Sequence, residues 1–293
     1  DFSELVANAP GDEVKISVDD KHWAEIKSGK VKYRLAGMSD RDYPKIPDRP
    51  NDWATVESAV IIEMINKTAF AVSQDENRIN VAGICVSSDT SRLTMTSTDG
   101  HKMCRVSKLA PGVPSTTGVI LPRKGAESIK SLCMQGPACR IAIAGGYLHV
   151  KQDDVTVSCK LIDAVFPTMM INQILEVSRP NVLTIDRLGA LQAMKRASLM
   201  TDEAIPIKLE CGIGGTQITT TNPDMGLVEE SLESEYHGDP IAIGFNPKYV
   251  VEILSQMTSD GVRLEMAGPL DPVMVRPGSG EDYTGIVMPM RVT

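Results

Sequence analysis

Apolar and polar residues alternate along several short stretches of the chain, and other short stretches are runs of β-branched residues. A period of two is typical of strands that bury one face. The clearest such segments are Val14–Val18, Ile141–Ile143, Val155–Cys159 and Ile218–Thr221. Dipeptides that favour tight turns lie between strand segments, at Asp99-Gly100, Gly145-Gly146 and Gly214-Gly215. The pattern predicts antiparallel sheets.

A few segments instead show apolar residues at intervals of three and four, the spacing of one helix face. In the first of them, Val60, Ile61, Met64 and Ile65 would share a face. Helices are expected over four segments, which are Val56–Val72, Lys124–Met134, Ile185–Met200 and Pro247–Met257.

The two shorter helices belong to a longer repeat. The segment Gly118–Gly125, the helix after it and Cys139–Ile143 form one unit, which Ile241–Tyr249, a helix and Val262–Met266 repeat about 123 residues later. The first residues, with a helix end at Asp1–Ala7 and a strand at Val14–Val18, match the end of this unit. A third copy would be complete only with about 75 residues before Asp1.

We therefore predict three domains, the first of them partial, over residues 1–50, 51–176 and 177–293. Each complete copy is expected to be an α+β module with helices on one face of antiparallel sheets. Placed side by side, such modules would turn their sheets outward and their helices inward.

Composition narrows the possible functions. The formal net charge is −8, and 42% of the 293 residues are hydrophobic, but no apolar stretch is long enough to span a membrane. The six cysteines lie beside apolar residues and have no partners at zinc spacing, so we expect buried reduced thiols, no metal site and a cytoplasmic location. They are Cys85, Cys104, Cys133, Cys139, Cys159 and Cys211.

Two alternatives stay open on residues alone. His101 lies near Asp99 and several serines, which suits a hydrolase, although two residues that flank a glycine turn fit a hairpin better. A β-rich extracellular ligand-binding module would require disulfides. No glycine-rich phosphate loop followed by Lys-Ser/Thr is present, which argues against an ATP-driven motor.

Five segments in order resemble the bacterial DNA polymerase III beta subunit, the DNA sliding clamp family. They are Thr98–Met103, Val119–Gly125, Phe166-Pro167, Ile243–Asn246 with Tyr249, and Ile286–Arg291. The resemblance covers essentially the whole chain, starting late in the first domain of the family. It implies a non-catalytic processivity factor that forms a head-to-tail dimeric ring around duplex DNA. Ile171-Asn172 depart from the family, which often has a basic and an apolar residue there.

The resemblance also implies a groove for short linear peptides of partner proteins, between the second and third domains. Met288 and Met290 lie two residues apart on an expected strand, and flexible methionines suit a site that serves several ligands. The matching positions are Val81, Thr98, Gly100, His101, Lys102, Met103, Phe166, Pro167, Asn246, Tyr249, Pro272, Ile286, Met288, Met290 and Arg291.

A sliding ring should attract phosphates through basic side chains and avoid reading bases. Basic residues on or beside the expected helices, or in the loop after the first, are Lys67, Arg78, Arg123, Lys124, Lys130, Arg187, Lys195, Arg196 and Lys248. Residues placed where subunits of the family meet are Lys30, Lys32, Tyr33, Leu199, Met200, Glu229 and Glu230.

The resemblance further implies a set of partners and no cofactor. Those partners are duplex DNA, a second copy of the chain, the replicative polymerase catalytic subunit, an ATP-dependent clamp loader, and other polymerases and repair proteins. The expected location is the cytoplasm, in association with the nucleoid.

Overall fold

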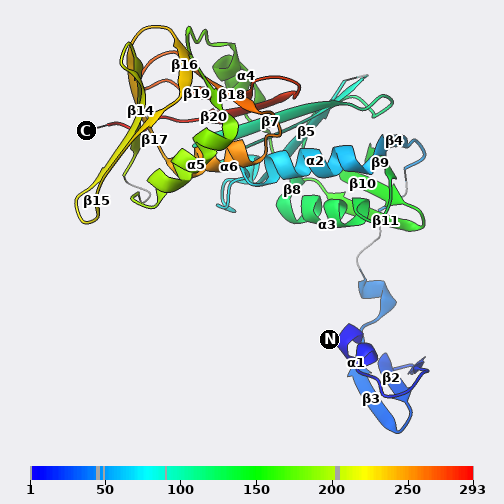
Figure 1. Cartoon of the computed structure of the whole chain (residues 1–293). Coiled ribbons are helices and arrows are strands. Elements are labelled where there is room, and N and C mark those ends of the chain that lie inside the picture. The colour runs from blue at the N-terminus through cyan, green and yellow to red at the C-terminus, as the bar shows by residue number, and fades with distance from the viewer. Residues whose placement is uncertain (1, 44–46, 49, 90, 202–204, 293) are drawn as a thin grey trace. The chain divides into compact units, whose positions relative to one another are not determined.

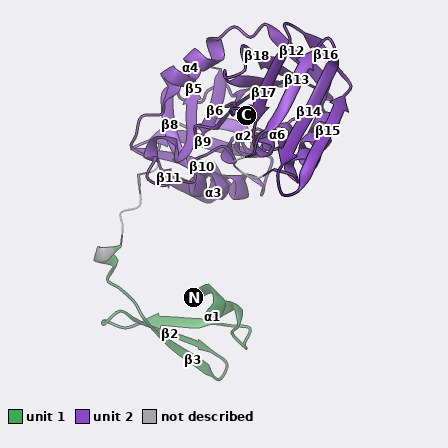
Figure 2. Cartoon of the chain, turned by 90° about the vertical axis from the view of Figure 1, so that its left-hand side faces the viewer, with its two compact units in different colours: residues 1–48 green, residues 49–293 purple. Residues whose placement is uncertain are grey.

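The computed structural model describes residues 2–43, 47–48, 50–89, 91–201 and 205–292. The chain divides into two compact units, Asp1–Asp48 and Arg49–Thr293 (Figure 2).

The first unit is a three-stranded antiparallel sheet with a short helix before it. Its elements are α1 (Phe2–Ala7), β1 (Lys15–Val18), β2 (Trp23–Ser28), β3 (Val31–Ala36) and the 3-10 helix η1 (Asp40–Asp42). The strand order is β1-β2-β3, so β3 is an edge strand. Lys32 and Tyr33 lie on this edge strand, and Lys30 lies in the turn just before it.

The second unit contains two copies of one element order. The first copy comprises β4 (Ala54–Glu57), α2 (Ser58–Ala69), η2 (Ile79–Val81), β5 (Gly83–Ser88), β6 (Arg92–Thr98), β7 (Lys102–Leu109), β8 (Thr116–Pro122), α3 (Arg123–Cys133), β9 (Ala138–Ala144), β10 (Tyr147–Gln152) and β11 (Val155–Lys160). A connecting helix, α4 (Thr168–Glu176), follows. The second copy comprises β12 (Asn181–Asp186), α5 (Arg187–Ser198), β13 (Ile207–Gly212), β14 (Gly215–Asn222), β15 (Gly226–Leu232), β16 (Ser234–His237), β17 (Ile241–Phe245), α6 (Pro247–Ser255), β18 (Gly261–Met266), β19 (Val273–Pro277) and β20 (Tyr283–Val287).

This order confirms the predicted repeat. Both copies run from a strand to a helix, then through several strands to a second helix and three final strands, and β16 is an addition in the second copy. The elements α1, β1, β2 and β3 of the first unit match the last four elements of each copy. The expected boundaries at residues 50 and 176 stay a prediction.

One sheet joins the two copies. Its order is β16-β12-β18-β19-β20-β7-β6-β5-β8, and β20 of the second copy pairs with β7 of the first from Tyr283–Val106 to Val287–Lys102. Two smaller sheets flank it, with orders β11-β10-β9-β4 and β15-β14-β13-β17. Because backbone hydrogen bonds cross the junction, the two copies share one continuous surface.

The nine-stranded sheet is covered on both faces. Along β7, Cys104 and Val106 lie in the large core with residues of α2, α3, α5 and α6, whereas Met103 lies in a second core with Ile171 of α4. Successive strand residues point to opposite faces, so α4 packs on the face away from the other four helices. Figure 1 shows those four helices following one another along one side of the second unit.

The four predicted helices are present, three of them shorter than predicted and α3 shifted by one residue, whereas α4 was not predicted. Two of them begin at side-chain caps: Asp186 accepts a hydrogen bond from Gly189 N at 2.6 Å, and Asn246 accepts one from Lys248 N at 3.0 Å. All six cysteines are buried and free, as predicted. Among the described helices there is no candidate for a membrane-spanning segment.

Candidate functional site

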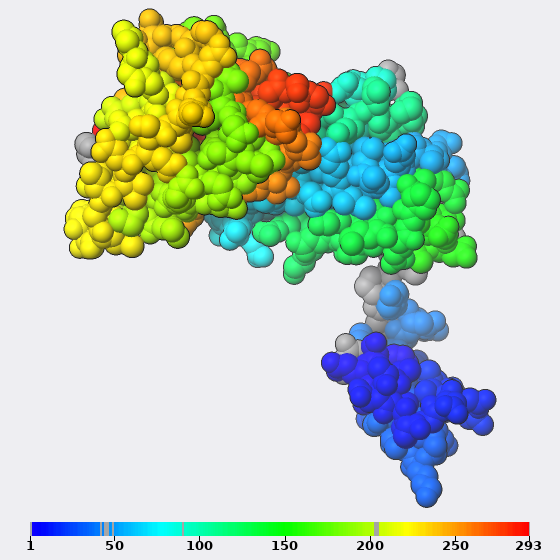
Figure 3. Space-filling view, viewed as in Figure 1, coloured from blue at the N-terminus to red at the C-terminus, as the bar shows by residue number. Residues whose placement is uncertain are grey.

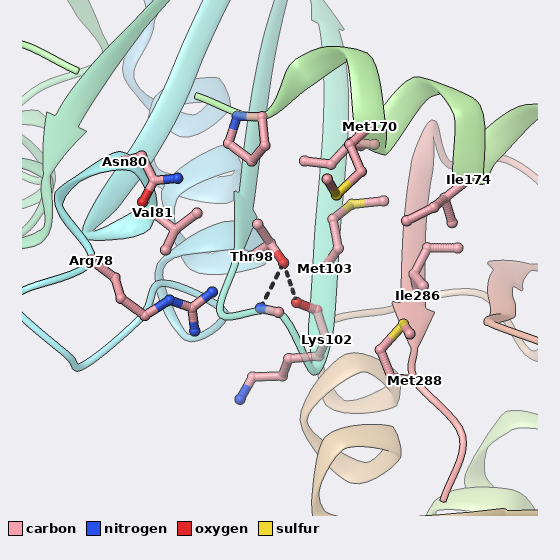
Figure 4. A pocket seen from close by; sticks show the side chains of 13 residues that line it. Arg78, Asn80, Val81, Thr98, Lys102, Met103, Met170, Ile174, Ile286 and Met288 are labelled. Carbon is pink, nitrogen blue, oxygen red and sulfur yellow. Dashed lines mark hydrogen bonds between the residues drawn. The ribbon is translucent and has the colours of Figure 1, made fainter. Parts of the chain in front are cut away.

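A largely apolar cavity of about 330 Å³ lies where the two copies meet. Figure 4 shows side chains converging on it from η2, the β6–β7 hairpin, α4 and the end of β20. Its lining consists of Arg78, Asn80, Val81, Thr98, Gly100, Lys102, Met103, Pro167, Met170, Ile171, Ile174, Ile286 and Met288. We call this cavity the groove.

The β6–β7 hairpin is held by its own side chains. Thr98 Oγ1 accepts a hydrogen bond from Gly100 N at 3.1 Å and donates one to Lys102 O at 2.8 Å (Figure 4). The Asp99 carboxylate accepts from His101 N and Lys102 N at 2.8 and 2.9 Å. Gly100 has a φ of +92°, a backbone angle that residues other than glycine rarely adopt. The turn therefore presents Thr98 and Met103 to the groove in a fixed arrangement.

Two backbone hydrogen bonds position the C-terminal segment. Met288 N donates to His101 O at 2.8 Å, and Met290 N donates to Gly244 O at 2.7 Å. A Cβ atom at residue 244 would come within 2.7 Å of Met290 O, so this close approach requires glycine. Ile286 and Met288 thus line the groove, whereas Met290 lies beyond it.

Lys102 links the two copies electrostatically beside the groove. Its side chain is only 8% exposed, and its amine lies 2.9 Å from the Asp99 carboxylate and 3.2 Å from that of Glu252 on α6. It also lies 4.5 Å from the centre of the Tyr249 ring. Burial alone would lower the pKa of Lys102, but the two carboxylates raise it above its ordinary value. The amine therefore stays charged and engaged.

Eight of the fifteen predicted groove residues line the cavity, which are Val81, Thr98, Gly100, Lys102, Met103, Pro167, Ile286 and Met288. The other seven lie outside its lining, and these are His101, Phe166, Asn246, Tyr249, Pro272, Met290 and Arg291. Phe166 is 7% exposed in the core under α4, Asn246 caps α6, and Pro272 O accepts a hydrogen bond from Arg179 Nε. His101 stacks on Tyr249 at 6.2 Å between ring centres.

Five lining residues were not predicted for the groove, which are Arg78, Asn80, Met170, Ile171 and Ile174. The last three share one face of α4. Their spacing of one, three and four residues is the sequence signal that could have predicted an apolar helix face here. Arg78 was assigned to DNA instead. Its guanidinium donates to Asp99 O at 2.6 Å, so it lies in the groove beside the hairpin.

Most of the predicted basic residues lie on the side formed by α2, α3, α5 and α6, whose atoms form one surface strip in Figure 3. Arg123, Lys124, Lys195, Arg196 and Lys248 are exposed, while Lys130 and Arg187 are half-buried. Arg123 pairs with Glu127 at 3.5 Å, and Arg196 Nε donates to Glu230 at 3.0 Å.

The assignment of Lys67 to DNA is wrong. Its side chain is 4% exposed, and its amine lies 2.7 Å from Glu63 and 2.6 Å from Glu281, a residue of the second copy. The carboxylates hold the pKa of Lys67 above its ordinary value against the effect of burial. The amine is thus part of an internal ion-pair network.

The predicted subunit-contact residues lie on or near two sheet edges. Leu199 is 73% exposed after α5, and Met200 is half-buried next to it. Glu229 and Glu230 lie on β15, which is an edge strand, as is β3 with Lys32. Within their own units Lys32 pairs with Glu25, and Glu230 pairs with Arg196.

The geometry around His101 does not form a catalytic triad. Asp99 directs its carboxylate to Lys102 and to backbone amides, and the His101 ring faces Tyr249. An acid that orients the base is a requirement of triad chemistry. The extracellular alternative required disulfides, and the six cysteines are free.

Comparison with known proteins agrees with this fold. The model of the DNA polymerase III beta subunit central domain matches residues 55–168, and that of the C-terminal domain matches residues 173–291. The chain is 26% identical to the beta sliding clamp of Pseudomonas putida over 99% of the chain and 79% of that protein. It is 27% identical to the beta sliding clamp of Staphylococcus aureus, over 99% of the chain and 78% of the relative.

Solved structures show the same architecture. The DNA polymerase sliding clamp of Bacillus subtilis superposes with a TM-score of 0.90 at 24% identity, covering 100% of this chain and 78% of that one. A protein described as a putative DNA polymerase III beta subunit from Eubacterium rectale gives 0.89 at 23% identity, covering 99% and 80%. The family models together match well over half of the chain. The chain therefore belongs to the DNA polymerase III beta subunit family, and its function is that of a DNA sliding clamp, a processivity factor rather than an enzyme.

Proposed function

We propose that the groove is the site through which this clamp holds its clients by short linear peptides. The single observation that carries this proposal is the apolar cavity built jointly by both copies, with three methionines, Met103, Met170 and Met288, in its lining. Methionine side chains repack around different ligands. The clients are the replicative polymerase catalytic subunit, other polymerases and repair proteins.

The helix side of the clamp faces duplex DNA in this proposal. Exposed basic residues on α3, α5 and α6 attract phosphates without reading sequence. A closed ring must be opened to admit duplex DNA, and the sequence contains no phosphate-binding loop followed by Lys-Ser/Thr, so a separate ATP-dependent loader places the clamp on DNA. The protein works in the cytoplasm, associated with the nucleoid.

The repeat suggests how two subunits close a ring. Within the second unit, β20 pairs with β7. By position in the repeat, β3 corresponds to β20 and β15 corresponds to β7, and both are edge strands. We propose that β3 of one subunit pairs with β15 of the next.

The register of this pairing follows when corresponding residues are traced across the observed strand pairs. One trace starts from the match of Val14–Val18 with Val262–Met266. The other starts from the match of the start of α3 with the start of α6. The observed pair Thr284–Arg105 then becomes Lys32 opposite Glu229. Opposite charges across an antiparallel pair are favourable and help to set register.

The groove is tested by fluorescence-polarisation titration of a labelled Gln-Leu-Ser-Leu-Phe peptide. Burial of two apolar anchors, less ordering costs, leads us to expect a Kd on the order of micromolar. Met170→Ala should weaken binding roughly threefold to tenfold. The matched control is Met169→Ala, since Met169 is also an exposed methionine on α4 but does not line the groove.

A chain lacking residues 288–293 should lose binding while remaining folded by circular dichroism. If the two methionine variants weaken binding equally, or the shortened chain binds as well as the full chain, the groove is not the peptide site.

A further inference from the structure

A second, polar cavity of about 240 Å³ lies on the other flank of α4. Its lining shares no residue with the groove and consists of Cys85, Ser87, Thr94, Thr96, Arg105, Phe166, Thr168 and Asn172. Arg105 and Met103 lie two residues apart on β7, so the two cavities open on the same face of the sheet. The polar cavity contains one cation and no carboxylate.

Arg105 is half-buried with only neutral partners. Its Nε donates to Thr96 Oγ1 at 3.3 Å, and its Nη2 donates to Asn172 Oδ1 at 2.9 Å. Among the residues that the structure describes, no hydrogen bond uses Nη1. Burial lowers the pKa of Arg105, and the Cys85 thiol raises it.

Other arginines of the chain have acidic partners or, like Arg179 and Arg187, donate to backbone carbonyls. Arg92 pairs with Asp282, Arg123 with Glu127, and Arg196 with Glu230. A guanidinium stays protonated in proteins and presents a planar fork that matches a carboxylate or phosphate. A half-buried charge without a counter-ion is unfavourable, so the position of Arg105 calls for an anion from outside.

Hydroxyl groups surround the guanidinium in strand register. Ser87 pairs with Thr94 across β5 and β6, and Thr96 pairs with Arg105 across β6 and β7. Thr168 is the first residue of α4, where backbone N–H groups favour negative charge. Thr96 Oγ1 accepts from Arg105, and Thr94 Oγ1 lies 2.8 Å from Ser107 Oγ, so the hydroxyls of Ser87 and Thr168 and the helix end are the potential donors beside this cation.

We propose that this cavity binds a single carboxylate or phosphoryl group, which accepts hydrogen bonds from the Nη1 side of the Arg105 guanidinium. The volume is below that of sites for drug-sized ligands, so the bearer is a small free anion or one acidic side chain. A client peptide held in the groove is the nearest source of such a side chain, and this part of the inference rests on the proposed function.

The anion itself is tested by following the arginine Nε–Hε signals of the whole chain by NMR. Sodium phosphate and sodium acetate are titrated separately, against sodium chloride at equal ionic strength. The expected result is a saturable shift of the signal that is missing in Arg105→Gln. Arg92→Gln is the matched control and should leave this shift unchanged. Equal shifts with chloride, or shifts that persist in Arg105→Gln, would overturn the proposal.

The source is tested with extended peptides. A helix is about 10 Å wide, which about four extended residues span, so Gln-Leu-Ser-Leu-Phe is extended at either end by three glycines and two aspartates. Versions with two asparagines are the neutral controls. An acidic side chain that reaches Arg105 should tighten Kd roughly threefold to tenfold over the neutral peptide, and Arg105→Gln should abolish this gain.

The outcomes separate the two proposals. Salt-induced shifts without a gain from acidic peptides would assign the cavity to a free anion. If the neutral peptide does not bind, the groove is not the peptide site, and the result of the anion titration still stands. Absence of both the salt-induced shifts and the gain from acidic peptides would overturn the anion site.

Discussion

At the scale of single residues, Lys67 shows how far a side chain's role can depart from its local sequence. It lies in the last turn of an amphipathic helix, which indicated a solvent-exposed position. Its amine instead meets Glu281, 214 residues later in the chain. No local pattern reports an interaction of that separation, so the sequence could not distinguish this buried lysine from the exposed basic residues of the other helices.

Glu281 should stabilise the protein in a pH-dependent manner. Burial alone would raise the pKa of Glu281, but Lys67 and Thr258 lower it to about 2 from an ordinary 4.5. A carboxyl whose pKa falls on folding contributes stability above its unfolded pKa, and that contribution is lost as pH drops toward the folded value. Glu281→Gln should therefore lower the free energy of unfolding by about 1–3 kcal/mol at pH 7 and flatten the loss of stability between pH 4.5 and 2.

Urea unfolding of the second unit at several pH values measures this effect. Glu127→Gln is the control, because its pair with Arg123 is exposed and should contribute less than about 1 kcal/mol. Equal effects of the two substitutions at pH 7 would contradict a special role for Glu281.

At the scale of elements, the repeat was predictable because its signals are local. Strand alternation, a helix start after Pro122 or Asn246 and the following strand recur at nearly constant spacing. Helix α4 has no counterpart in the repeat, so the spacing of its apolar residues was the local signal, and Met169 and Met170 beside the buried Ile171 are exposed. Its position is fixed by packing on a sheet face that forms only once both copies have folded.

Asn246 illustrates an element-scale role that sequence comparison assigned to ligand binding. It is 5% exposed, and its side chain caps α6. Asn246→Ala should lower stability by about 1 kcal/mol without a matching loss of peptide affinity in the folded protein. Asn246→Asp preserves an acceptor and should retain most of the stability. Thermal unfolding and peptide titration of the same samples check this, and a large affinity loss at unchanged stability would contradict the capping role.

At the scale of the whole molecule, the proposed ring makes a prediction about strand edges. Cysteines at Lys32 and Glu229 should form an intersubunit disulfide under mild oxidation, visible as a dimer on non-reducing gels. The Tyr33→Cys and Glu229→Cys combination is the control, since residues 32 and 33 point to opposite sheet faces. Equal cross-linking of both pairs would contradict the register, and no cross-linking of either would contradict the pairing of the two strands.

The basic helix side makes a second prediction at this scale. Changing Lys195 and Lys248 to Glu should weaken binding to duplex DNA and reduce the slope of log K against log salt by roughly 0.9 for each phosphate that is no longer neutralised. Lys160→Glu alters an exposed lysine on β11 whose side chain points away from the strand face on which Cys159 contacts α3, and should change the slope little. Anisotropy titrations at several salt concentrations distinguish the variants, and equal slopes would contradict the assignment.

The junction of β7 and β20 has a consequence for what partners can be held. Met103 and Ile286 face each other on paired strands, so the width of the groove floor equals the distance between hydrogen-bonded strands, about 4.8 Å. Backbone geometry sets that width, and side-chain replacements leave it unchanged. Substitutions during evolution can deepen the groove or alter its chemistry, yet every partner binds over a floor of the same width.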